Sequence, residues 1–327
     1  MLKIINQIIF KVVVVSFNIL LSLPVNNSLY AGSSPGDENE KSKQFSVDLG
    51  GYKLHFDIKG SGPETIVIEC GVGSWSLMWK DFQDELSKHY RVVLYDRAGY
   101  GKSDPSPYGR TVKEIARELH EALKKTDLKG PFILMGHSYG GYVVRSYAKQ
   151  FPEDVKELIY ADAAYEDQFS FFHPALNVFL ERSKEYNRNM GTAFRSGEMT
   201  FNNVEIDSSL SKEYWNSYKL AKSRATHYDA VYNEMELLSL SYIQSTIDKP
   251  LDIPLTVITA GNSFQTFANL PALLIRESNK IWMDLQKRQL NTSTKSKHII
   301  IENGTHDLKN SVKKEFIQAI ITALDRK

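Results

Sequence analysis

Short, almost wholly apolar runs alternate along this chain with longer segments of helical periodicity, and this alternation constrains the fold more than any other feature. A strand that is apolar on both sides must be covered on both sides, so such runs are typical of a parallel sheet between two helical layers. The sequence therefore predicts an α/β fold with a mostly parallel sheet. The predicted strands are residues 65–69, 91–95, 131–135, 155–161, 254–260 and 297–301.

Helices are expected between these strands, and a hairpin is expected before them. Residues 45–49 and 52–58 flank Gly50-Gly51 and alternate between apolar and polar side chains, which indicates a β-hairpin. Apolar residues recur at helical spacing in the segments that follow the strands. The predicted helices are residues 78–89, 111–125, 139–150, about 274–290 and 311–324.

Residues 163–249 interrupt the alternation. This segment is rich in aromatic residues and has helical stretches but no good strand. It follows the sixth predicted strand, counting the hairpin, and so begins at the carboxyl edge of the sheet, where ligands bind in folds of this kind. We therefore predict a helical cap over a binding site. The alternative is a helical subdomain with its own core and no part in binding.

The first 31 residues have the layout of a secretory signal peptide. Lys3 and Lys11 precede a short apolar run, Pro24 ends it, and small polar residues lead to Ala31. An uncleaved anchor over residues 4–23 is the alternative, because that stretch is just long enough to span a bilayer. Residues 32–43 are a polar linker to a domain over residues 44–327. The expected location is secreted, or outside the cytoplasm on a membrane tether.

Charge and cysteine content exclude several classes of function. The chain has 40 Lys and Arg against 39 Asp and Glu, so its net charge gives no reason to expect a nucleic-acid partner. Its single cysteine, Cys70, excludes an intrachain disulfide and a cysteine-based zinc site.

A G-x-S-x-G motif lies between a predicted strand and a predicted helix. It reads Gly136-His137-Ser138-Tyr139-Gly140 and follows the strand over 131–135. A serine in this tight turn projects its hydroxyl above the sheet edge, and the two glycines let strand and helix pass close together. Ser138 is therefore the candidate nucleophile.

A serine nucleophile needs a base and two donors for the oxyanion. His306 follows the strand over 297–301, where a loop can bring its imidazole to Ser138. The expected donors are the backbone N–H of Tyr139 and that of Val72, which lies in the loop after the strand over 65–69. His137 is expected to point elsewhere.

Three motifs together resemble the α/β-hydrolase superfamily. They are Tyr95-Asp96-Arg97-Ala98-Gly99-Tyr100-Gly101-Lys102-Ser103-Asp104, the Ser138 motif, and Gly304-Thr305-His306. The chain most resembles bacterial carboxylesterases and proline-iminopeptidase-like enzymes, from about residue 44 to its end. The resemblance implies a serine hydrolase without a cofactor. Two features depart from the pattern: Cys70-Gly71 stands where many members have His-Gly, and no carboxylate follows the strand over 254–260.

The acid of the predicted triad must then come from elsewhere. In some members the acid ends the preceding strand, and Asp162 occupies that place while keeping the order Ser138, Asp162, His306. Asp167 and Glu166 are the alternatives. Asn262, at the usual place, could orient an imidazole but would stabilise its positive charge less well.

The sequence thus predicts a carboxylesterase acting on a small-molecule ester with an apolar group. A proline-iminopeptidase-like aminopeptidase is the first alternative, because the predicted cap holds several carboxylates. The run over 71–76, GVGSWS, approaches a dinucleotide-binding fingerprint, so a nicotinamide-dependent dehydrogenase is a more distant alternative. A non-catalytic binding module is another.

Overall fold

The computed structural model describes residues 42–267 and 270–325. The predicted signal peptide or anchor over 1–31 and most of the linker lie outside these residues. The first strand of the hairpin begins at Lys43, which pairs with Ile58. Within the described ranges, no helix combines the length and apolar character that a membrane crossing requires.

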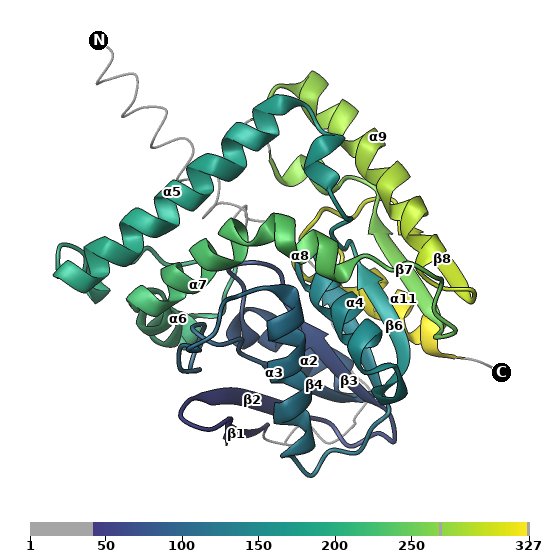
Figure 1. The fold of residues 1–327 in the computed structure, drawn as a ribbon, viewed down its shortest axis with the longest axis horizontal. Coiled ribbons are helices and arrows are strands. Elements are labelled where there is room, and N and C mark those ends of the chain that lie inside the picture. The colour runs from purple at the N-terminus through teal and green to yellow at the C-terminus, as the bar shows by residue number, and fades with distance from the viewer. Residues whose placement is uncertain (1–41, 268–269, 326–327) are drawn as a thin grey trace.

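Eight strands form a single sheet in the order β1-β2-β4-β3-β5-β6-β7-β8 (Figure 1). β2 runs antiparallel to both β1 and β4, and the remaining neighbours are parallel. The predicted mostly parallel α/β sheet is therefore confirmed. The strands are Lys43–Asp48, Lys53–Lys59, Thr65–Glu69, Arg91–Tyr95, Phe132–His137, Val155–Ala161, Leu255–Ala260 and Ser296–Ile301.

Helices cover both faces of the sheet. The two faces hold separate apolar clusters, one packed with side chains of α3 and α4, the other with those of α2 and α11. In the second cluster Phe82 stacks on Phe316 at 4.9 Å between ring centres. The helices are α2 (Lys80–Leu86), α3 (Val112–Lys124), α4 (Gly140–Gln150), α9 (Ala272–Arg288), α10 (Leu308–Ser311) and α11 (Lys313–Leu324).

The predicted helix over 78–89 is shorter than expected. A 3₁₀ turn over Ser76–Trp79 comes first, and α2 follows from Lys80. The apolar residues Met78 and Trp79 are buried within that turn, so the apolar periodicity extends further than the α-helix itself. α3 begins where the sequence suggests, because the side chain of Thr111 accepts a hydrogen bond from Glu114 N at 3.4 Å.

The segment between β6 and β7 is helical, as predicted. In Figure 1 the long helix α5 crosses above α6 and α7, and α8 lies near α4. Side chains of this insertion, Tyr218, Val231 and Met235, share one apolar cluster with Ile68 and Trp75 of the sheet layer. The insertion therefore packs on the carboxyl edge of the sheet as a cap. Its helices are α5 (Pro174–Ser196), α6 (Trp215–Lys222), α7 (Ala225–Glu236) and α8 (Leu238–Ser245).

Candidate active site

Ser138 lies in the tight turn between β5 and α4. Its φ is +53°, a strained value for a residue with a side chain. A Cβ atom on Gly136 would come within 2.5 Å of Gly140 O, and one on Gly140 within 2.2 Å of Glu69 O. Both positions therefore require glycine, which is why the motif has this spacing.

The structure brings Ser138, His306 and Asp162 together. Ser138 Oγ lies 3.0 Å from His306 Nε2, and His306 Nδ1 lies 2.6 Å from Asp162 Oδ2. A carboxylate oxygen can only accept, so Nδ1 carries the proton and Nε2 is left to accept from the serine hydroxyl. The side chains come from the ends of β5 and β6 and from the loop after β8.

Asp162 is surrounded by hydrogen-bond donors. Its Oδ1 accepts from Ala260 N at 3.1 Å and from Trp282 Nε1 at 2.8 Å, and its Oδ2 also accepts from Ser263 Oγ at 2.7 Å. Burial alone would raise the pKa of this carboxyl, but the hydrogen bonds from His306, Trp282 and Ser263 lower it below the ordinary 3.8. Asp162 is thus held as a buried carboxylate.

Trp282 and Ser263 are site residues that the sequence analysis missed. Ser263 lies in the segment after β7, which lacks a carboxylate. Its hydroxyl instead donates to Asp162, the acid that follows β6. Trp282 comes from α9, where an apolar residue at helical spacing looks like an ordinary core residue.

The other candidate acids lie elsewhere. Glu166 forms an ion pair with Arg145. Asp167 is exposed at the start of a short 3₁₀ turn. The amide of Asn262 is also exposed and donates to Glu302 O at 2.7 Å. Of these candidates, Asp162 is the one that contacts His306.

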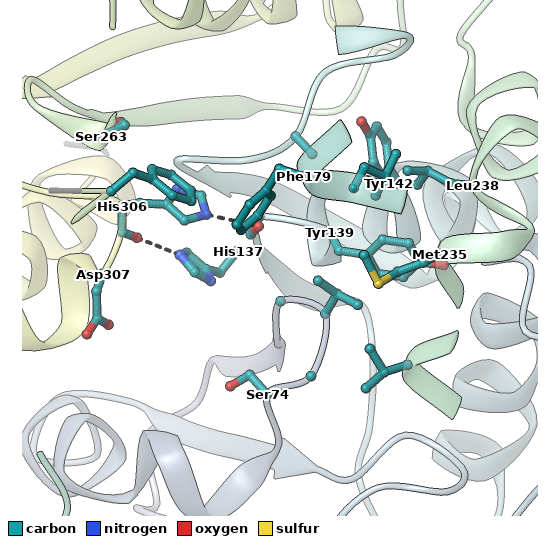
Figure 2. A pocket seen from close by; sticks show the side chains of 18 of the residues that line it. Ser74, His137, Tyr139, Tyr142, Phe179, Met235, Leu238, Ser263, His306 and Asp307 are labelled. Carbon is teal, nitrogen blue, oxygen red and sulfur yellow. Dashed lines mark hydrogen bonds between the residues drawn. The ribbon is translucent and has the colours of Figure 1, made fainter. Parts of the chain in front are cut away.

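The expectation that His137 points elsewhere is wrong. Its ring lines the same cavity as Ser138, and its Nε2 lies 2.8 Å from the backbone oxygen of His306 (Figure 2). A carbonyl only accepts, so Nε2 carries a proton. Burial, with a smaller contribution from His306, lowers the pKa of His137 to about 4, so the ring is neutral at pH 7. His137 anchors the loop that carries His306.

The loop after β3 lies directly against the nucleophile. A Cβ atom on Gly71 would come within 3.2 Å of Ser138 Cβ, so glycine lets the loop approach, and Val72 lines the cavity beside Tyr139. The run over 71–76 that resembles a dinucleotide fingerprint thus forms a wall of this site. Cys70 is buried, which raises the pKa of its thiol and leaves it a poor nucleophile.

Arg97 holds this loop in place. Its guanidinium donates to Cys70 O at 2.6 Å and to Gly71 O at 2.9 Å. The same group pairs with Glu69 at 2.6 Å and with Glu234 of α7 at 2.9 Å, and all three charged side chains are buried. The arginine of the Tyr95–Asp104 motif therefore joins the sheet, the loop and the cap.

A cavity of about 280 Å³ opens beside Ser138, between the sheet edge and the cap. His306 and His137 lie on one side, and Met235 and Leu238 on the opposite side (Figure 2). Such a cavity admits a small molecule with an apolar group. Other apolar wall residues are Trp75, Met78, Phe172, Leu176, Phe179, Tyr218, Val231, Phe264 and Trp282.

Among the described residues, no group of three His, Cys, Asp or Glu side chains could hold a metal ion.

Comparison with known proteins identifies the family. The alpha/beta hydrolase fold family matches residues 64–307, which is more than half of the chain. The protein therefore belongs to the alpha/beta hydrolase fold family.

The individual curated relatives share limited sequence identity with this chain. YqjL of Bacillus subtilis is 27% identical over 251 residues, covering 76% of this chain and 79% of YqjL. A cis-3-alkyl-4-alkyloxetan-2-one decarboxylase of Shewanella oneidensis is 30% identical, but over 36% of this chain and 37% of that enzyme. One further curated relative is matched over 20% of its own length.

Solved structures share the fold at low identity. A thermophilic esterase from Thermogutta terrifontis aligns with a TM-score of 0.58 and 20% identity, over 86% of this chain and 98% of that chain. At this identity the likeness shows the fold alone.

Proposed function

We propose that this protein is a serine hydrolase that cleaves carboxylic esters, with Ser138 as nucleophile, His306 as base and Asp162 as the acid of the triad. One observation carries the proposal: an unbroken hydrogen-bonded chain from Ser138 Oγ through His306 to the buried Asp162, at the wall of a largely apolar cavity. Membership of the alpha/beta hydrolase fold family supports it.

The proposed reaction has two halves. Ser138 Oγ attacks the ester carbonyl carbon while His306 Nε2 takes the hydroxyl proton, and the N–H groups of Tyr139 and Val72 stabilise the oxyanion. The C–O bond to the alcohol then breaks, and His306 gives its proton to the leaving alkoxide. Water, deprotonated by His306, attacks the acyl-enzyme and releases the acid, and the proton returns to Ser138.

The polar groups of the cavity favour esters over aminoacyl amides. An aminopeptidase needs a carboxylate to receive the α-ammonium group of its substrate. Asp307, an acid among the described wall residues, already pairs with Lys309 at 2.5 Å. Glu234 of the cap is occupied by Arg97 and by the hydroxyl of Tyr100, at 2.8 Å.

Labelling and turnover test this proposal together. A serine-reactive phosphonate should modify Ser138, and Ser138→Ala should lower ester turnover about 10⁴-fold or more while the circular dichroism spectrum stays unchanged. Label on another residue, or full activity in Ser138→Ala, would refute the assignment. Faster cleavage of a proline amide than of any short ester would establish the aminopeptidase instead.

We also propose that residues 1–31 direct export. The charged start, apolar run and small residues of this segment support the proposal. Expression of the full chain and of a variant lacking residues 1–31, followed by fractionation and N-terminal sequencing, tests it. Full-length protein free in the cytoplasm would contradict both the cleaved and the anchored alternatives.

A further inference from the structure

The cap end of the cavity carries two polar side chains that the proposed ester chemistry does not use. Lys222 ends α6, His227 lies in the first turn of α7, and both line the cavity. Lys222 Nζ lies 3.1 Å from His227 Nε2 and 5.2 Å from the ring centre of Tyr228. An ammonium and an imidazole thus share one end of an otherwise largely apolar space.

Lys222 has no ion pair within the described parts of the chain, where no carboxylate lies within 4.0 Å of its Nζ. Asp207 is near enough to act on Lys222 through space, but it is not part of the cavity wall. Its Oδ1 accepts from Ser209 N and Oγ, and its Oδ2 is buried without a hydrogen-bond partner. Burial lowers the pKa of Lys222 to about 8, so the amine is still mostly protonated at pH 7.

His227 adds a second donor. A protonated lysine only donates, so His227 Nε2 accepts from it and the ring proton lies on Nδ1. That Nδ1 is buried and has no hydrogen-bond partner, in a side chain that is 1% exposed. Burial, followed by the charge of Lys222, holds the pKa of His227 well below its ordinary value, so the ring stays neutral. The pair therefore presents donors and no free acceptor.

An ammonium with no carboxylate in contact and a buried donor without an acceptor are both costly in an apolar setting. An anionic group on a ligand in the cavity would supply the ion pair that Lys222 lacks. The same two cap helices also supply apolar side chains to the cavity wall, among them Tyr218, Val231 and Met235. A matching ligand is anionic at one end and apolar in the middle.

We propose that Lys222 and His227 form an anion subsite, and that the preferred ester carries a carboxylate separated from the scissile carbonyl by an apolar chain. This rests on the proposed ester hydrolysis at Ser138. It assigns the substrate class as half-esters of dicarboxylic acids, or esters whose alcohol bears a carboxylate.

A series of esters tests the subsite. The probes are monoesters of dicarboxylic acids of increasing chain length, matched neutral esters of equal length, and esters with the carboxylate on the alcohol. At one chain length we expect wild-type kcat/KM to favour the anionic ester by about tenfold or more. Lys222→Met should lower the ratio of anionic to neutral kcat/KM by about 10–100-fold, and Lys222→Arg should retain most of it.

Lys219→Met is the matched control. Lys219 lies on the same helix, but its Nζ lies over Phe201 at 4.7 Å and it does not line the cavity, so this variant should keep the wild-type ratio. Neutral and anionic esters hydrolysed equally well by wild type at every length would overturn the subsite, as would an equal loss of both in Lys222→Met. Hydrolysis of no ester at all would instead refute the proposed function. The wild-type ratio decides the proposal even where Lys222→Met fails to fold.

Discussion

Replacing Asp162 by asparagine tests the proposed triad most directly, because the two side chains have nearly the same shape. Ala260 N and Trp282 Nε1 both donate to Oδ1, so the amide oxygen of asparagine must take that place. Its NH₂ group then faces His306 Nδ1 at the former Oδ2 position. His306 can accept from that group only with its own proton on Nε2, where it cannot accept from Ser138.

The magnitude follows from two losses. Reaching the active tautomer leaves two donors facing each other, at a cost of about 1–3 kcal/mol. The imidazolium formed during reaction also loses a carboxylate partner, an attraction of about 4 kcal/mol at an effective dielectric constant near 20 and ~4 Å. Together they amount to about 5–7 kcal/mol, which places the loss in turnover at or above the upper end of a range of about 10²–10⁴-fold.

The assay is kcat for a short-chain ester at pH 7–8, measured beside the rate of phosphonate labelling of Ser138. Both should fall together, while KM changes little. Asp167→Asn is the matched control, because Asp167 also has a positive φ, +49° against +45° for Asp162, but is exposed and far from this network. An Asp162→Asn enzyme within about fivefold of wild type, or a loss as large in Asp167→Asn, would refute the reasoning.

Two further predictions follow from the charged groups around the site. Glu234→Gln removes one partner of the buried Arg97. Urea denaturation should therefore show a loss of about 3 kcal/mol in unfolding free energy, together with a lower kcat. An unchanged unfolding midpoint would contradict the role given to this pair. The pKa of Asp162 is lower in the folded than in the unfolded chain, so its stabilising contribution is present above about pH 4 and is lost as pH falls through the folded pKa. Unfolding free energy measured from pH 2 to 7 should therefore fall less steeply with acid in Asp162→Asn than in wild type, and parallel curves would contradict this.

The positions of the strands along the chain, the turn at Ser138 and the place of His306 could all be read from local sequence. Each depends on residues close together along the chain: an apolar run, two glycines around a serine, a histidine after a strand. Asp162 was predicted because the end of a neighbouring parallel strand lies at the same edge of the sheet. This reasoning does not depend on which donors surround Asp162.

The remaining contacts join residues far apart along the chain, and local patterns do not encode them. Trp282 reaches Asp162 from a helix that begins more than a hundred residues later, and His137 contacts the backbone of His306, which lies 169 positions further along the chain. The role of Arg97 depends on Glu234, which is one of several carboxylates in the cap. Sequence alone could not single it out.

The buried contacts of Arg97 limit how far the cap can be treated as an interchangeable module. Exchanging the segment between β6 and β7 for that of another hydrolase would remove Glu234 and leave the buried Arg97, under the loop that carries Val72, with Glu69 as its remaining carboxylate partner. A transplanted cap must therefore bring a carboxylate at the position of Glu234, or the recipient must also lose Arg97. Directed evolution of specificity in this protein is better served by substitutions on the cavity-facing side of α6 and α7 than by replacement of the whole cap.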